Sequence, residues 1–131
     1  SHVIKEGSDI VILSTGSMVS VALDAAGQLE EKLHASVGCV DCHCLSPIDK
    51  VLLGQINHSR LIVTVEEHSV NGGLGTVVSD YFGQHPGFPH ILKLGINGFS
   101  VVGDYQYLLE QHRLTAPQIV EDIEKKYISI V

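Results

Sequence analysis

The stretch CVDCHC, residues 39–44, concentrates metal-binding side chains in a single hexapeptide. Its first five letters match the C-x-x-C-H pattern of c-type haem attachment. The hexapeptide belongs to an apolar run that predicts a β-strand, in which Cys39, Asp41 and His43 would share one face. The other two cysteines would point to the opposite face. One ion cannot gather ligands from both faces of a flat strand, and free cysteine behaves as a small buried hydrophobe. We therefore interpret the thiols as packing residues.

A second polar set, Glu66, Glu67 and His68, directly follows the apolar run LIVTV. In parallel α/β sheets, ligands collect at the carboxyl ends of strands, and imidazole titrates near neutral pH. This set is therefore a candidate polar site. The alternative is that these residues satisfy loop backbone groups or face a partner subunit. We favour the alternative, because an acid–histidine cluster without a nucleophile or a metal set is not a mechanism.

The same segment continues with Asn71, Gly72, Gly73 and Gly75, at the start of a helix predicted over residues 74–82. Exposed N–H groups at a helix start can bind phosphate. The glycines do not form a G-x-G-x-x-G pattern, and no Walker lysine follows them. A tight strand-to-helix turn, in which glycine permits positive φ, explains them adequately. With the preceding acid–histidine set they form one candidate ligand or interface site.

No other residues combine into a catalytic or metal centre. Ser14, Thr15 and Ser17 are not part of a G-x-S-x-G elbow, and Ser17 is expected to cap the following helix. The spacing of three further histidines does not form a metal site. These histidines fall in predicted loops or helix ends: His85, His90 and His112.

Strand and helix patterns alternate along the chain. Strands are predicted over residues 9–15, 37–44, 60–65 and 91–94. Helices are predicted over 18–34, 49–56, 74–82, 104–112 and from 115 through Ile119, Val120 and Ile123, with a glycine-rich loop over 95–103. This alternation favours one α/β domain with a largely parallel sheet.

Composition narrows the class of protein. The 131 residues, 44% of them hydrophobic, are enough for one domain with one core. The net charge of -7 and the lack of a basic cluster argue against a nucleic-acid surface. The apolar runs fall far short of the roughly 20 residues that span a bilayer, and no signal peptide is recognisable. Three cysteines within one hexapeptide suit a reducing compartment, so we expect a cytoplasmic protein.

Four segments resemble, in order and spacing, the C-terminal domain of the transketolase family. The most distinctive is Thr64–Phe82, TVEEHSVNGGLGTVVSDYF, in which an apolar strand, an acidic pair, His and Gly-Gly-x-Gly lead into a helix. Ser8–Ala26 is similar to the opening strand, Thr-Gly-Ser turn and helix of that domain. Val40–Asp49 and His112–Tyr127 are similar to its Pro-Ile-Asp turn and its closing helix. The same pattern occurs in 1-deoxyxylulose-5-phosphate synthases and in 2-oxo-acid dehydrogenase beta subunits.

The resemblance implies a three-layer α/β/α domain with a mixed, mostly parallel five-stranded sheet. An edge strand, here His2–Lys5, would run antiparallel to the others. Residues 1–131 would form this one domain, as the C-terminal part of a larger enzyme.

The resemblance also implies where the chemistry takes place. Transketolases use thiamine diphosphate with Mg2+ or Ca2+, held between two other domains across a dimer interface. The C-terminal domain adds dimer contacts and supplies none of the principal cofactor ligands. This chain lacks the Gly-Asp-Gly and Asn-Asn metal-diphosphate motif. We therefore expect no catalytic, cofactor or metal residue in it, and partners in the other transketolase domains or subunit and in a second copy of the enzyme.

Three hypotheses remain. The first is the C-terminal domain of a transketolase that moves two-carbon ketol units between sugar phosphates, with the domain inactive by itself. The second is a self-standing regulatory module that binds a small anion around Glu67, His68 and Gly72. The third is the same domain in a deoxyxylulose-phosphate synthase or a 2-oxo-acid dehydrogenase.

Overall fold

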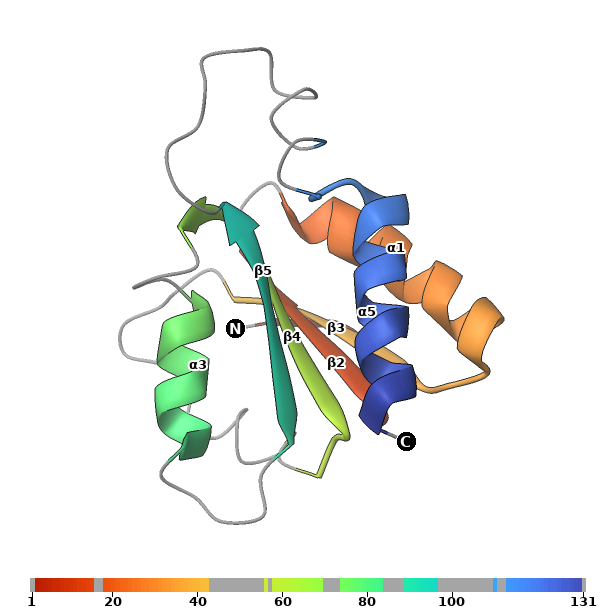
Figure 1. Ribbon diagram of the computed structural model, residues 1–131, viewed down its shortest axis with the longest axis horizontal. Helices are drawn as coiled ribbons and strands as arrows, with labels where there is room; N and C mark the ends of the chain where they lie inside the picture. The colour runs from red at the N-terminus through yellow and green to blue at the C-terminus, as the bar shows by residue number, and fades with distance from the viewer. Residues whose placement is uncertain are drawn as a thin grey trace.

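Strand β2 (Ile10–Ser14) is buried at all five positions. Successive side chains of a strand point to opposite faces, so burial at every position requires cover on both sides of the sheet. The computed structural model provides this cover with helices on both faces (Figure 1). It describes residues 2–15, 18–42, 56, 58–69, 74–83, 89–96, 110 and 113–130.

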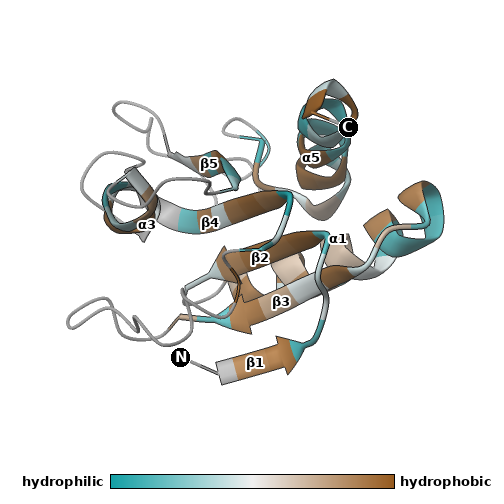
Figure 2. Cartoon of the chain, turned by 90° about the horizontal axis from the view of Figure 1, so that it is seen from below, coloured by the Kyte–Doolittle hydropathy of each residue, from teal (hydrophilic) through white to brown (hydrophobic). Residues whose placement is uncertain are grey.

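The sheet has five strands in the order β1-β3-β2-β4-β5 (Figure 2). Parallel pairing joins β2 to β3 (Val37–Asp41) and to β4 (Leu61–Ser69), and joins β4 to β5 (His90–Ile96). At the other edge, β1 (His2–Lys5) pairs antiparallel with β3. The expected mixed sheet with an antiparallel edge strand is therefore confirmed.

In the part of the chain that the structure describes, three helices cover the sheet. Helix α3 (Leu74–Gly83) lies on one face, and α1 (Met18–Leu33) and α5 (Ala116–Ile130) lie together on the other, as Figures 1 and 2 show. The arrangement confirms the predicted three-layer α/β/α architecture. Among the described residues, no helix has the length and apolar character needed to cross a membrane.

Each face of the sheet has its own hydrophobic core. The larger core packs α1 and α5 against the sheet and includes Ile12, Leu29, Val63, Ile119 and Ile123. The smaller core lies under α3 and includes Val11, Leu13, Ile62, Val78 and Phe82. Residues of β2 and β4 alternate between the two cores, as the strand period requires.

The start of α5 confirms a prediction from the sequence. Thr115 precedes the helix, and its backbone N–H and its hydroxyl both contact the Gln118 Oε1 atom, at 3.4 Å and 2.8 Å. A threonine followed three residues later by glutamine is the sequence pattern of a capping box, and here the glutamine accepts the backbone N–H of Thr115. As predicted, the helix runs through three apolar residues, and all three are buried: Ile119, Val120 and Ile123.

Three predicted strand ends were wrong. Strand β4 extends four residues beyond Val65, and β5 includes His90, Gly95 and Ile96, which the sequence assigned to loops. The two strands continue because they pair with each other as far as Ser69 and Ile96, a tertiary effect that local composition does not reveal. Most of the helices predicted over 49–56 and 104–112, the Ser17 cap and residues 97–103 of the predicted loop lie outside the described residues.

A salt bridge connects the edge strand β1 to α1. The Lys5 ammonium donates to the Glu30 Oε1 atom at 2.6 Å, and the Val37 N–H at the start of β3 donates to the same oxygen at 3.1 Å. Two hydrogen bonds lower the pKa of Glu30 below its ordinary value near 4.5. The bond from Lys5 has the larger effect and the bond from Val37 the smaller one. One carboxylate therefore links β1, α1 and β3.

We predict a pH-dependent contribution to stability from Glu30. Its pKa is lower in the folded than in the unfolded chain, so the contribution is fully present above the unfolded value near 4.5. It disappears as the pH falls through the folded value. Glu30→Gln should therefore be less stable than the parent chain at pH 7, and the difference should shrink below about pH 4. Urea unfolding at several pH values tests this, and a difference that grows on acidification would contradict it.

A second prediction concerns His34, which follows α1 with a φ of 53° and whose N–H donates to the Glu30 carbonyl at 3.0 Å. This left-handed position favours glycine. His34→Gly should stabilise the chain by about 0.5–1 kcal/mol, because the relief of strain exceeds the entropy cost of glycine. Denaturant titration measures the change. As a control, Glu31→Gly at an exposed helical position should cost about 1 kcal/mol, and a loss of stability in both variants would contradict the prediction.

Candidate functional site

The candidate site is built around Glu66, near the carboxyl end of β4. This side chain is only 2% exposed. Its Oε2 atom accepts a hydrogen bond of 2.8 Å from the backbone N–H of Gly75, in the first turn of α3. The first N–H groups of a helix have no partner within the helix, and a carboxylate placed there also interacts favourably with the helix dipole. Glu66 therefore caps α3 from the neighbouring strand.

Gly75 is packed tightly between two strands. A Cβ atom at this position would lie 2.7 Å from Cδ of Lys93 on β5 and 2.9 Å from Oγ1 of Thr64 on β4. Thr64 and Lys93 are directly paired in the β4–β5 ladder. Gly75 does not have the positive φ that we had expected, so close approach of the strands is the reason for glycine here. Among the described residues, the buried Thr64 hydroxyl has no hydrogen-bond partner.

The polar residues that follow Val65 form an irregularity of the sheet. Val65 pairs with Leu94 and Ser69 with Ile96, so β4 advances by four residues while β5 advances by two. We call Glu66–His68 the β4 bulge. Bulges bend a strand and change the direction of its side chains, and they occur frequently beside functional sites.

The structure brings two of the predicted site residues together, Glu66 and Gly75. Glu67 and His68 belong to the β4 backbone, and their side chains lie outside the described part of the structure. The positions of three others also lie outside it: Asn71, Gly72 and Gly73. Sequence reasoning missed Thr64 and Lys93. A single threonine within the apolar run LIVTV was the available signal for Thr64.

This geometry bears on how α3 could bind an anion. The Gly75 N–H, one of the donors that a phosphate at the helix start would use, already binds Glu66. A fixed carboxylate at the same place would also repel an anion. The arrangement is suited to holding β4 and α3 together.

The two described cysteines of the hexapeptide lie on opposite sides of the sheet, as the strand period predicts. Cys39 belongs to the core under α1 and α5, and Cys42 to the core under α3; both side chains are thiols and not halves of a disulfide. Burial raises the pKa of the Cys39 thiol, which disfavours the thiolate that binds metals. His43 and Cys44 lie outside the described residues.

Thiamine diphosphate with a divalent metal would need oxygen ligands for the ion. In the part of the chain that the structure describes, no group of three His, Cys, Asp or Glu side chains could hold a metal. The buried Glu66 carboxylate is engaged by Gly75. These residues therefore do not fit the cofactor, and the expectation that it is held elsewhere in the parent enzyme stays a prediction.

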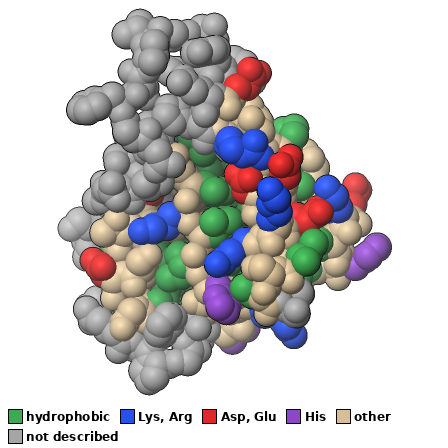
Figure 3. All heavy atoms as spheres, in the orientation of Figure 1, with side chains coloured by type: hydrophobic (Ala, Val, Ile, Leu, Met, Phe, Trp, Pro, Cys, Tyr) green, Lys and Arg blue, Asp and Glu red, His purple; other side chains and the backbone are tan. Residues whose placement is uncertain are grey.

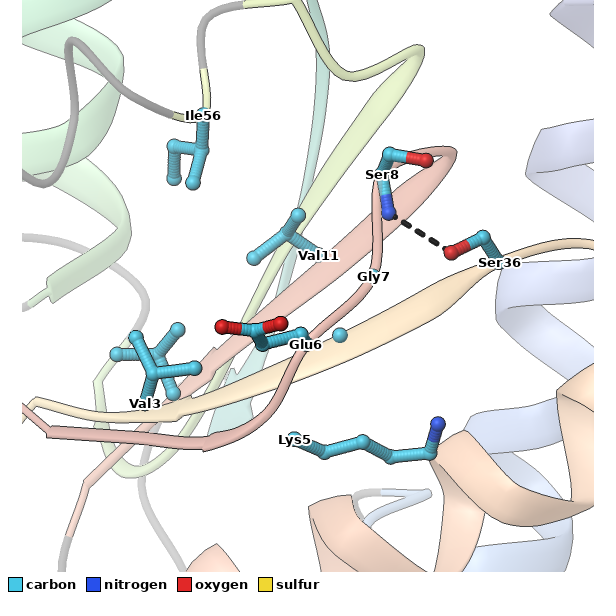
Figure 4. Close-up of a pocket in the computed structure, with 10 residues that line it drawn as sticks. Val3, Lys5, Glu6, Gly7, Ser8, Val11, Ser36 and Ile56 are labelled. Carbon is cyan, nitrogen blue, oxygen red and sulfur yellow. Dashed lines mark hydrogen bonds between the residues drawn. The ribbon is translucent and has the colours of Figure 1, made fainter.

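A groove of about 440 Å³ lies at the other end of the sheet, near the residues that precede β2 and β3. Val3, Val11 and Ile56 contribute its apolar walls, and Glu6 points into the same space, whereas the Lys5 side chain turns away toward α1 (Figure 4). The backbone N–H of Ser8 donates to the Ser36 hydroxyl at 3.0 Å. The groove is separate from the β4 bulge, and its polar groups do not converge on a reacting centre.

Acidic and basic side chains are interspersed on the face shown in Figure 3. Opposite charges also pair elsewhere among the described residues: Arg113 pairs with Asp122 at 3.1 Å and with Glu121 at 3.2 Å. The described residues of this face do not form the continuous basic surface that binding to a phosphate backbone requires.

Comparison with known proteins identifies the family. The model of the transketolase C-terminal domain family matches residues 1–119. The chain belongs to this family. The transketolase C-terminal domain is similar to several curated relatives: it is 34% identical to a 1-deoxy-D-xylulose-5-phosphate synthase of Acinetobacter baumannii, over 97% of the chain and 21% of that protein. It is also 32% identical to one of the subunits of an apulose-4-phosphate transketolase of Actinobacillus succinogenes, over 91% of the chain and 39% of that relative.

Solved structures show the same fold. A split-gene transketolase, solved as an inactive beta4 tetramer, superposes with a TM-score of 0.88 at 36% identity, over 98% of this chain and 42% of that one. A transketolase of Campylobacter jejuni superposes with a TM-score of 0.68 at 21% identity, over 94% of this chain and 18% of that one, which shows the fold alone. The chain therefore spans between about a fifth and two fifths of the length of these relatives.

We predict that Gly75→Ala destabilises the transketolase C-terminal domain by about 1–3 kcal/mol, because the new methyl group overpacks the contact with Thr64 and Lys93. Two of its three nearest atoms belong to Lys93, so the cost should be smaller in a Lys93→Ala background. Urea unfolding of the four chains in a double-mutant cycle measures both effects.

The matched control is Gly83→Ala, at the end of the same helix, where a Cβ atom would have no neighbour within 4 Å. This variant should be neutral or slightly stabilising, by up to about 1 kcal/mol. Equal costs at Gly75 and Gly83, or a Gly75→Ala cost that Lys93→Ala leaves unchanged, would contradict the packing explanation.

Proposed function

We propose that this chain is the C-terminal domain of a thiamine diphosphate-dependent transketolase. The parent enzyme would transfer a two-carbon ketol unit from a ketose phosphate to an aldose phosphate in the cytoplasm. Residues 1–131 would form one domain of that enzyme. The observation that carries the proposal is the full-length likeness to the split-gene transketolase, at 36% identity and a TM-score of 0.88.

In this proposal the domain acts by packing and dimerisation, and by itself it is catalytically inactive. Thiamine diphosphate and its Mg2+ or Ca2+ ion are held by the other domains. Two observations support a structural role: Glu66 is used to cap α3, and the Cys39 thiol is buried in the core. The partners would be the remaining transketolase domains or subunit, together with a second copy of the enzyme. Neither a nucleic acid nor a membrane is a partner in this proposal.

The second candidate is the same domain in a 1-deoxy-D-xylulose-5-phosphate synthase. Relatives of that name, from Acinetobacter baumannii and Chlorobium luteolum, are 34% and 37% identical over almost the whole chain. The two reactions differ in the donor. A 1-deoxy sugar has a methyl group at C1, so its two-carbon unit must come from an acetyl-level donor such as a 2-oxo acid.

A self-standing anion-binding module gains no support from Gly75, whose N–H already binds Glu66.

An assay of the parent gene product with thiamine diphosphate and Mg2+ distinguishes the two donors. A transketolase should convert xylulose 5-phosphate and ribose 5-phosphate into new sugar phosphates without releasing CO2, because the donor leaves behind a shorter aldose phosphate. A synthase should release CO2 from pyruvate in the presence of an aldose phosphate acceptor. Mass spectrometry of the sugars and trapping of labelled CO2 record the outcomes, and CO2 release with no ketol transfer would overturn the first proposal.

The 131-residue chain provides the control for the role of the domain. It should show neither activity, and its melting temperature should not change when thiamine diphosphate and Mg2+ are added. A ligand at a hundred times its dissociation constant would stabilise the folded chain by about 2.7 kcal/mol. A clear thermal shift would therefore contradict the proposal that other domains hold the cofactor.

A further inference from the structure

The register of β1 decides which of its side chains face the groove near the starts of β2 and β3. Val3 pairs with Val40. Lys5 pairs with Cys39 instead of residue 38, so β1 advances by two residues while β3 advances by one. One extra residue in a strand turns the next side chain to the other face. Val3 therefore lies at the groove, whereas the Lys5 ammonium reaches Glu30 on α1 at 2.6 Å (Figure 4).

The walls of the groove are apolar and continue the smaller core. Three of its wall residues, Val11, Val40 and Ile56, belong to that core and are buried. The more exposed Val3 forms the outer wall. Small-molecule sites are commonly clefts of this size, about 440 Å³, with mostly apolar walls and a few polar groups that orient the ligand.

Glu6 is the charged group that can orient a ligand in this groove. It follows β1, is exposed and points into the groove (Figure 4). In the described part of the chain, no hydrogen bond or ion pair engages its carboxylate. Lys5, which also contributes to the lining, is already paired with Glu30. The groove therefore combines an apolar surface with an unpaired negative charge at its rim.

We propose that this groove binds a small organic cation, a primary alkylammonium ion with an unbranched chain. The ammonium donates to the Glu6 carboxylate, and the alkyl chain packs against Val3, Val11 and Val40. Glu6 repels an anion, and a neutral ligand leaves its charge unused. The net charge of -7 also favours cations over anions. This site is additional to the proposed function and lies at the other end of the sheet from the β4 bulge.

The two parts of the ligand contribute unequally to its affinity. An ion pair with an exposed carboxylate is weak and changes a dissociation constant by about fivefold at most. Most of the affinity comes from the alkyl chain, because its contribution grows with the apolar surface that is removed from water. We therefore expect a dissociation constant in the millimolar range for a short chain.

Three probes with the same six-carbon chain test the proposal: hexylammonium, hexanol and hexanoate. Each is titrated at pH 7 into the 15N-labelled 131-residue chain, and the amide shifts are followed by NMR. Hexylammonium should give saturable shifts at residues 3–8 and 36–40. Hexanol should shift the same amides with an affinity about twofold to fivefold weaker, and hexanoate should bind more weakly than hexanol. Added salt should reduce the difference between hexylammonium and hexanol.

Two variants of the groove separate the charge from the apolar wall. Glu6→Gln keeps the size of the side chain and removes its charge, so the affinity for hexylammonium should fall to that for hexanol, while hexanol binds as before. Val3→Ala removes part of the wall and should weaken hexylammonium and hexanol by the same factor. Glu31→Gln is the matched control, because Glu31 is an exposed carboxylate on α1 that does not line the groove. It should leave all three affinities unchanged.

Several results would overturn the proposal. They are the absence of saturable shifts at residues 3–8 and 36–40, equal binding of hexanoate and hexylammonium, and an unchanged affinity for hexylammonium in Glu6→Gln. An equal loss of affinity in Glu31→Gln would show that the cation binds carboxylates in general and would also overturn it. Each measurement is made on the chain itself, so its outcome does not depend on which reaction the parent enzyme catalyses.

Discussion

The structure depends on the burial of β2 from both sides. All five of its residues are inaccessible or nearly so, and a strand in that position needs a parallel neighbour on each edge and a helical layer on each face. The parallel pairing in turn requires crossover connections, which place α1 on one face and α3 on the other, and α5, after the last strand, packs beside α1 (Figure 2). The central strands have apolar side chains on both faces, so most polar residues are restricted to the ends of the strands and to the outer layers.

The candidate site shows how the fold accommodates polar groups near a strand end. Glu66 is buried, and the start of α3 supplies the donor that its carboxyl group needs. Gly75 permits this contact because it leaves room for Thr64 and Lys93. The irregular pairing between β4 and β5 at the same place is therefore part of one connected arrangement of strand, helix start and neighbouring strand.

Membership of the transketolase C-terminal domain family and the geometry of the site support the same kind of role. The described residues provide a rigid α/β scaffold and no constellation with a nucleophile, a base and an oriented partner. A fold hosts many activities, and the family assignment alone does not choose between ketol transfer and deoxy-sugar synthesis. This chain spans only about a fifth to two fifths of the relatives it matches, so most of their length lies outside the comparison.

The sequence by itself determined the elements and their buried sides, because hydrophobic periodicity is a local property. It predicted the stripe of α5 and the placement of Cys39 and Cys42 on opposite faces, whereas the antiparallel direction of the edge strand was implied by the family resemblance. Only the tertiary structure decided the bond from Glu66 to Gly75, the contact of Gly75 with Lys93 and the salt bridge from Lys5 to Glu30. Each of these joins residues on different elements. Their proximity depends on strand order and register, which are set by the packing of the whole sheet and by no local pattern.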